Sequence, residues 1–126
     1  MFTLSAKNVI SDAILVHVKD GVGDAAILLR DGDGVLLATL QILPGDEGSV
    51  DPLTATITLN PGADEDNAPA TGTAATGDLI NRSGVVIDEG REVVQGTVAI
   101  KGKIVISSTE IVAGGSVRLI GASMEF

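Results

Sequence analysis

The last thirty-one residues, Gly96 to Phe126, constrain the fold more than any other segment. They contain three short runs rich in β-branched residues, and glycine-bearing turns separate these runs. Such runs are typical of β-strands, and no acid, base or nucleophile is grouped among them for chemistry. The segment therefore predicts a scaffold of paired strands whose partner is a protein.

Length and composition exclude several classes of function. A chain of 126 residues is long enough for one buried core, so we expect a single domain over residues 1–126. It contains no Tyr or Trp, the side chains that most often stack on sugars and bases. It also contains no Cys, which excludes disulfides, thiolate metal sites and thiol catalysis.

The net charge of −9 is distributed unevenly. Residues 1–81 carry twelve acids and three bases, whereas residues 82–126 carry five of each. An acidic surface repels phosphates, so no nucleic-acid partner is expected. No apolar run approaches the roughly twenty residues that span a bilayer, and the N-terminus lacks the features of a secretory signal. We therefore expect no membrane partner, and synthesis in a cytoplasm from which the protein leaves only by lysis.

The first eighteen residues predict an N-terminal helix or arm. Ser5 is a candidate N-cap, and the run from 14 to 18 fits either the helix end or a first strand. Apolar residues at helical spacing predict one buried stripe, with the polar residues Lys7, Asn8, Ser11 and Asp12 on the opposite face. The stripe comprises Ala6, Val9, Ile10, Ala13 and Ile14.

From residue 24 onward the hydrophobic period is two. Residues 24–30 and 35–43 flank Asp31-Gly32-Asp33-Gly34, a sequence that strongly favours a tight hairpin turn. Alternation predicts two sets of inward-facing residues, with a row of Thr54, Thr56 and Thr58 facing solvent. The first set is Leu36, Ala38, Leu40 and Ile42, and the second is Leu53, Ala55, Ile57 and Leu59.

Residues 60–77 form an acidic segment rich in Gly, Thr and Ala, with no large apolar side chain to anchor a core. We expect an exposed loop over 61–69 and an extended, weakly packed stretch over 70–77. Further strands are expected at 78–80, 85–87, 93–100, 103–107 and 116–126. The predicted fold is all-β: residues 24–126 form an antiparallel, jelly-roll-like β-sandwich preceded by one short N-terminal helix.

Several groups of residues are candidates for metal binding or catalysis. Asp31-Gly32-Asp33 resembles half of a calcium loop, but the following residues lack the required acids, so a hairpin turn is favoured. Asp64-Glu65-Asp66 and Asp46-Glu47 with Asp51 could gather a hard cation if their loops met, although acidic loops are usually solvated. His17, the one imidazole, follows an apolar run and is better explained as structural than as a general base.

Three further motifs have structural explanations. The run from Ser107 to Glu110 resembles a capping box, but Gly114-Gly115 close behind it favours a turn between strands. Gly72-Thr73 and Gly96-Thr97 lack the lysine and following helix of a phosphate-binding loop. We therefore assign no catalytic, cofactor-binding or metal-binding residue, expect no cofactor, and predict a protein that is not an enzyme.

The chain resembles a group of small virion proteins of tailed bacteriophages. The resemblance runs in scattered blocks through most of the chain and is most specific near the C-terminus. After ATGTA the pattern departs, because residues 75–82 read ATGDLINR where such proteins tend to carry an aromatic residue and Arg-x-x-Asp. The matching blocks are residues 5–8, 12–14, 34–40 (GVLLATL), 70–74 (ATGTA), 96–98 and 107–117 (SSTEIVAGGSV).

Some proteins of this group are capsid decoration or cement subunits with a jelly-roll-like sandwich. The resemblance implies a virion structural protein on the outer capsid surface that binds the major capsid protein lattice and stabilises the head. A head-tail connector or tail component is the nearest alternative, and a calcium- or carbohydrate-binding β-module is the alternative from another class. Few charges between Val93 and Phe126 would leave strand edges open, which predicts a homo-oligomer, either a dimer or a trimer.

Overall fold

The computed structural model describes residues 1–125 and consists mostly of β-structure behind one N-terminal helix. Eight strands form one sheet in the order β2-β1-β6-β7-β8-β10-β4-β3, and β5 and β9 form a separate pair. The elements are α1 (Leu4–Val18), β1 (Ala26–Arg30), β2 (Leu36–Gln41), β3 (Gly48–Asp51), β4 (Thr56–Leu59), β5 (Gly72–Thr73), β6 (Thr76–Ile80), β7 (Val86–Gln95), β8 (Ile104–Ile106), β9 (Glu110–Ile111) and β10 (Leu119–Met124).

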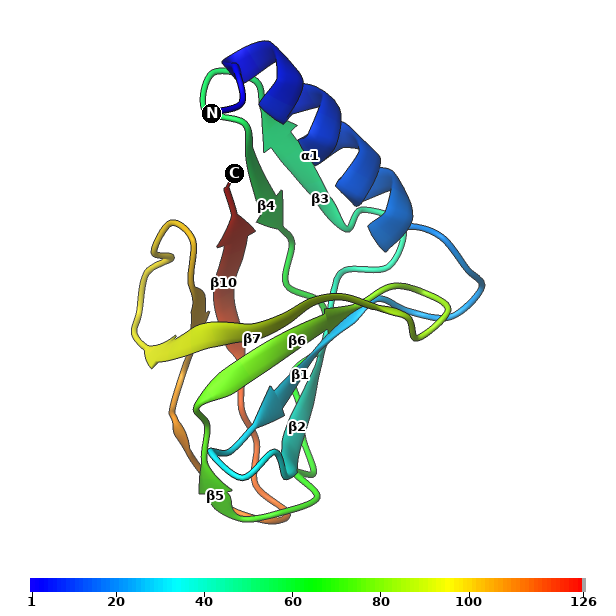
Figure 1. Cartoon of the computed structure of the whole chain (residues 1–126). Helices are drawn as coiled ribbons and strands as arrows, with labels where there is room; N and C mark the ends of the chain where they lie inside the picture. The colour runs from blue at the N-terminus through cyan, green and yellow to red at the C-terminus, as the bar shows by residue number, and fades with distance from the viewer. Residues whose placement is uncertain (126) are drawn as a thin grey trace.

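The large sheet curls strongly into a half-barrel and is not a clear sandwich (Figure 1). It is also mixed, because β7 and β8 pair in parallel whereas the other neighbours are antiparallel. The prediction of a mostly β fold with one N-terminal helix is confirmed. The prediction of an antiparallel sandwich is wrong in strand direction, because one pair of strands is parallel. Alternation identifies which side of a strand is buried, and it carries no information on the direction of the neighbouring strand.

The helix forms where it was predicted, and residues 14–18 belong to it. Its N-cap is Thr3, whose hydroxyl accepts a hydrogen bond from the backbone amide of Ala6, so the predicted cap at Ser5 is wrong. The predicted buried stripe is wrong at Val9 and Ala13, which are exposed. Ala6 and Ile10 are half-buried, and Ile14 packs against the core as predicted. The face that packs on the sheet instead contains Ser11 and Val18, both fully buried, with the half-buried Lys7, Asn8, Ile14 and Leu15.

Two hydrogen bonds explain why polar residues occupy the inner face of α1. The Ser11 hydroxyl donates to the backbone carbonyl of Ala55 at 3.1 Å, and the Asn8 side-chain amide donates to that of Pro52 at 2.8 Å. Both acceptors lie in the turn between β3 and β4, where backbone carbonyls need donors. The helix therefore faces the sheet with the side chains that satisfy this turn.

The predicted hairpin is confirmed, because β1 and β2 pair in antiparallel register around the turn. A bulge between Leu29 and Arg30 shifts the register, so Leu37 is fully buried while Leu36 is only partly so. Ala38, Leu40 and Ile42 are buried as predicted. The bulge adds one residue to the inward row, which strict alternation cannot anticipate.

The second predicted inward row begins later than expected. Leu53 lies in the turn that leaves β3 and is 81% exposed, so its predicted inward position is wrong. Ala55, Ile57 and Leu59 are buried as predicted, but Thr56 is buried too and breaks the expected row of solvated threonines. Ala55 has a φ of 53°, and this left-handed turn places consecutive side chains on the buried side at the start of β4.

Residues 60–77 pack more closely than their composition suggested. Ala68 and Ala74 are buried in the core cluster, so the expectation that nothing in this segment anchors the core is wrong. The backbones of Glu65 and Val117 exchange two hydrogen bonds, of 3.0 and 2.9 Å. Small side chains and backbone bonding to a distant segment hold this loop, and neither has a local sequence signal.

The strands predicted after residue 77 are confirmed only in part, because their bounds differ from the prediction. The predicted strands at 85–87 and 93–100 are one long strand, β7, which ends at Gln95. Within the described residues, β8 and β10 each have partners on both sides, and β9 pairs with β5. The predicted open strand edges between Val93 and Phe126 are therefore wrong for β8 and β10, whereas β9 has a partner on one side only. Phe126 itself lies outside the described residues.

Candidate functional site

The acidic turn that resembled half of a calcium loop is a hairpin turn. One Asp31 carboxylate oxygen accepts hydrogen bonds from the backbone amides of Asp33 and Val35, both at 2.9 Å. Gly34 has a φ of 84°, the left-handed conformation that this turn requires. The Asp31 carboxylate thus stabilises the turn, and the preferred sequence interpretation is confirmed.

The other acidic candidates do not meet. Within residues 1–125, no three His, Asp or Glu side chains gather closely enough to hold a metal ion. Asp64 and Asp66 are exposed on the 60–77 loop, whereas Glu47 is buried beside an arginine. Asp51 begins a turn, and its carboxylate accepts the Leu53 amide.

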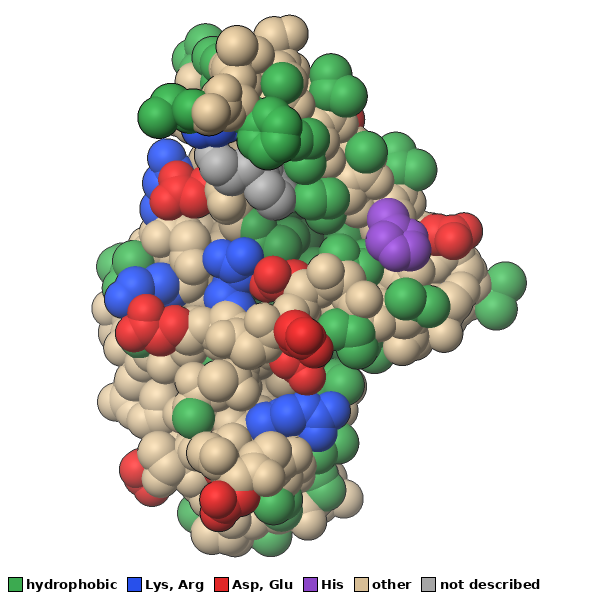
Figure 2. Space-filling model, in the orientation of Figure 1, with side chains coloured by type: hydrophobic (Ala, Val, Ile, Leu, Met, Phe, Trp, Pro, Cys, Tyr) green, Lys and Arg blue, Asp and Glu red, His purple; other side chains and the backbone are tan. Residues whose placement is uncertain are grey.

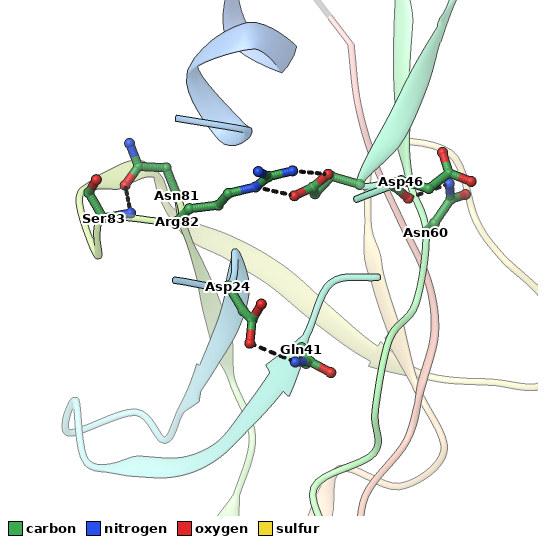
Figure 3. A network of polar contacts seen from close by, with 8 residues as sticks. Asp24, Gln41, Asp46, Asn60, Asn81, Arg82 and Ser83 are labelled. Carbon is green, nitrogen blue, oxygen red and sulfur yellow. Dashed lines mark hydrogen bonds and ion pairs between the residues drawn. The ribbon is translucent and has the colours of Figure 1, made fainter. Parts of the chain in front are cut away.

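Glu47 and Arg82 form the most buried ion pair among the described residues (Figure 3). The Glu47 side chain is 1% exposed, and its two oxygens accept from the Arg82 guanidinium, with Nη2 to Oε1 at 2.8 Å. The hydrogen bond from Arg82 lowers the pKa of Glu47, against the opposing effect of burial. The pair connects the start of β3 to the turn between β6 and β7.

A neighbouring polar turn positions Arg82. The Asn81 side-chain oxygen accepts the backbone amides of Ser83 and Val85, each at 2.9 Å. The loop after α1 packs closely here, because a Cβ on Gly21 would lie 2.2 Å from the Ser83 hydroxyl. In Figure 3, Arg82 extends from this turn toward Asp46, just before β3, and Asn60, just after β4, which are themselves hydrogen-bonded. This network holds loops together, and both oxygens of the Glu47 carboxylate are hydrogen-bonded to Arg82.

His17 is exposed on the last turn of α1. It lies in a shallow, open hollow with Ala13, Val16, Lys19 and Asp20. No hydroxyl or thiol lines this hollow, so the geometry gives His17 no nucleophile to activate.

The predicted turn at residues 107–110 is confirmed, and it leads into β9. The Ser107 hydroxyl accepts the Arg118 amide, and the Ser108 hydroxyl donates to the Glu110 carbonyl. Thr73, on β5, donates to the Glu110 carboxylate at 3.1 Å. Gly96 donates its amide to the Ile106 carbonyl at 3.1 Å. These motifs stabilise strands and turns, as the sequence favoured.

The outward face of α1 is the first candidate interaction surface. Ala6, Val9, Ala13 and Val16 follow one another along the helix; Val9 is 68% exposed and Val16 is 70% exposed. Figure 2 shows hydrophobic side chains gathered over the part of the molecule that α1 occupies in Figure 1. Because the opposite face is bonded to the turn between β3 and β4, the helix presents these side chains in a fixed orientation.

The loop between β7 and β8, here called the 96–102 loop, is the second candidate interaction surface. Its residues Val98 and Ile100 are exposed, and the loop lines a crevice of about 340 Å³ together with residues of β4 and β10. Thr58 and Ser123 contribute hydroxyls to this crevice, and Lys101 contributes a charge. A Cβ on Gly121 would lie 2.6 Å from that of Ala99, so a glycine permits the loop to lie directly on β10.

Comparison with known proteins finds no matching family model, no matching curated protein and no matching solved structure. Among residues 1–125, α1 is the one helix, and it is too short and too polar to cross a bilayer.

Sequence reasoning missed the Glu47–Arg82 pair. The charge distribution pointed to the N-terminal helix and the C-terminal third as the parts of the chain that contact protein, but it did not show which of their residues are exposed. The pair joins residues 35 positions apart, and neither residue has a local motif that points to the other. The surface on α1 was hidden by the assumption that the most apolar face of a helix packs on its own domain. Asn8 and Ser11, which donate hydrogen bonds to the β3–β4 turn, were the available signal that the other face of α1 packs inward.

Proposed function

We propose that this chain is a structural protein of a bacteriophage virion, a decoration or cement subunit that binds the major capsid protein lattice on the outer surface of the head. It would be made in the host cytoplasm and act on the head, without catalysis. The resemblance of residues 96–98 and 107–117 to small virion proteins supports this function. As part of this proposal, the curled sheet corresponds to the jelly-roll-like sandwich of such proteins.

The observation that carries the proposal is that two surfaces outside the acidic 60–77 loop expose apolar side chains. The α1 surface and the 96–102 loop expose Val9, Val16, Val98 and Ile100, whereas the exposed acids Asp64 and Asp66 belong to the 60–77 loop. Desolvating apolar groups is favourable and desolvating carboxylates is costly. The apolar surfaces are therefore the ones suited to protein contacts, and the acidic loop is suited to face solvent.

Co-sedimentation with empty heads tests this function. Heads are assembled from the major capsid protein of the phage that carries this chain and incubated with the purified protein. We expect saturable binding with a fixed number of copies per capsid protein, and heads that withstand a higher temperature. Ile100→Asp should weaken binding, while Glu89→Gln, an exposed position on β7, should not. Binding to purified tails or connectors in place of heads would favour the alternative virion position.

A further inference from the structure

We infer that the outward face of α1 is a contact between two copies of this chain, in which the helices pack side by side and in parallel. This inference rests on the proposal that the chain acts as an oligomer on the head, and it names the surface that joins the copies. The β8 and β10 strands have partners on both sides, so the contact is assigned to the helix rather than to these strands.

The spacing of the apolar residues along the outward face fits a helical partner; Val9, Ala13 and Val16 are exposed and Ala6 is half-buried. Ala6, Val9, Ala13 and Val16 are separated by three, four and three residues, which is the a and d spacing of a coiled coil over two heptads. Alanine at both a positions permits a close approach of two helix backbones, and valine at both d positions supplies the projecting side chains. A second α1 has the same geometry, so the two stripes are self-complementary.

Charge favours a second copy at this face over the rest of the surface. Two chains of net charge −9 repel each other, and this repulsion is smallest where acids are few or are matched by bases. The exposed charged residues beside the stripe are Asp12, Lys19 and Asp20, with His17 among them. The α1 surface is thus close to neutral within an acidic molecule.

The same residues select the parallel orientation. In a parallel pair, a g residue lies near the e residue five positions later on the other helix. Here Asp12 occupies a g position and His17 an e position, so each Asp12 would face His17 of the partner subunit on both sides of the pair. In an antiparallel pair with Val9 opposite Ala13, Asp12 would face its own copy, and two carboxylates would repel each other.

The contact is small, and its size predicts weak association in solution. Fifteen residues give a helix of roughly 22 Å, and one face of it buries much less than the roughly 800 Å² per partner of a standard interface. When subunits are bound side by side on a head, their high local concentration compensates for the low affinity. The pair would then link neighbouring subunits after they bind.

Single cysteines test the inference, because the chain has none of its own. Val9→Cys places two thiols opposite each other in a parallel pair, and Val98→Cys, at an equally exposed position on the 96–102 loop, is the control. With oxidised glutathione as the electron acceptor, we expect Val9→Cys to form a disulfide-linked dimer about tenfold faster than the control. Equal rates for the two variants would overturn the inference.

A charge exchange tests the orientation in the same assay. Asp12→Lys or His17→Glu, each added to Val9→Cys, should slow cross-linking, and the two together should restore it. Failure of the double variant to recover would overturn the parallel arrangement. All cross-linking is done without heads, so its outcome is independent of the binding assay: heads that bind a non-pairing variant sink this inference alone, whereas heads that bind no variant sink the proposed function.

Discussion

The guanidinium of Arg82 reaches across from the β6–β7 turn to the buried carboxylate of Glu47, 35 residues earlier in the chain. The contact joins two loops that no strand pairing connects, since β3 and β6 are not neighbours in the sheet. Together with the α1 hydrogen bonds to the β3–β4 turn, it fixes the β3–β4 end of the curled sheet relative to the β1–β2–β6 end.

Glu47→Gln should reduce the free energy of unfolding by about 2 kcal/mol at pH 7, because the amide cannot replace the charged, two-point hydrogen bonding to Arg82. Thermal or urea denaturation monitored by circular dichroism measures the loss. Glu89→Gln is the control, since Glu89 is exposed, and it should melt like the parent. An unchanged melting temperature in Glu47→Gln would contradict the stabilising role of the pair.

The same pair predicts a pH dependence. The pKa of Glu47 is lower in the folded chain than its ordinary value of 4.5, so the unfolded chain binds more protons in the acid range. The stabilisation is fully present above about pH 4.5 and is lost as the pH falls through the lower folded pKa. The difference in stability between the parent and Glu47→Gln should therefore shrink in denaturation series at acid pH. A difference that stays constant down to pH 2 would refute this assignment.

A buried leucine and an exposed leucine, both predicted to face inward, should respond differently to substitution by a charged residue. Leu40→Asp places a carboxylate in the fully buried core, at a cost of several kcal/mol, and should unfold the chain. Leu53→Asp changes a side chain that is 81% exposed and should leave the melting temperature nearly unchanged. Differential scanning calorimetry distinguishes the two, and similar melting of both variants would contradict the burial described above.

Two glycines in one turn offer a matched test of backbone conformation. Gly34 has a φ of 84° and Gly32 does not have a positive φ, and a Cβ at either position would meet open space. Gly34→Ala should therefore cost about 1 kcal/mol of stability through backbone strain alone, while Gly32→Ala should cost little. Equal losses in urea denaturation would argue against the left-handed turn.

The elements that sequence predicted correctly have local signals. The turn at Asp31 and Gly34 and the periodicity of α1 depend on residues close together in the chain, and both were found. The side of α1 that packs inward was predicted wrongly because Ser11 and Asn8 bond carbonyls in a turn 44 residues away. The parallel pairing of β7 and β8, and the partners of the 60–77 loop, likewise depend on distant segments.

The sequence indicated that the chain has surfaces suited to protein contacts, but it did not show which residues form them. The balanced charge of residues 82–126 predicts protein contacts on this part of the chain, and that prediction stays open. Within residues 82–125, β7, β8 and β10 have neighbours on both sides, and β9 has one on one side. The exposed apolar residues of the two candidate surfaces lie on the outside of α1 and on the loop of Val98 and Ile100. Local alternation does not distinguish an apolar residue that meets its own core from one that meets another molecule.

Neutralising the acidic loop tests which surfaces face the head. Asp64→Asn, Glu65→Gln and Asp66→Asn together should change neither thermal stability nor binding to empty heads, because Glu65 contacts Val117 through its backbone. Sedimentation and calorimetry on the triple variant measure both properties. A folded triple variant that no longer binds heads would mean that the loop is itself part of the interface.

The central claim is that this chain decorates a phage head, and a density map of the mature virion tests it most directly. The account predicts repeated density of this fold on the outer surface of the head, with the 96–102 loop against the major capsid protein and the 60–77 loop toward solvent. Density confined to the connector or the tail, or a virion without this chain, would contradict the account.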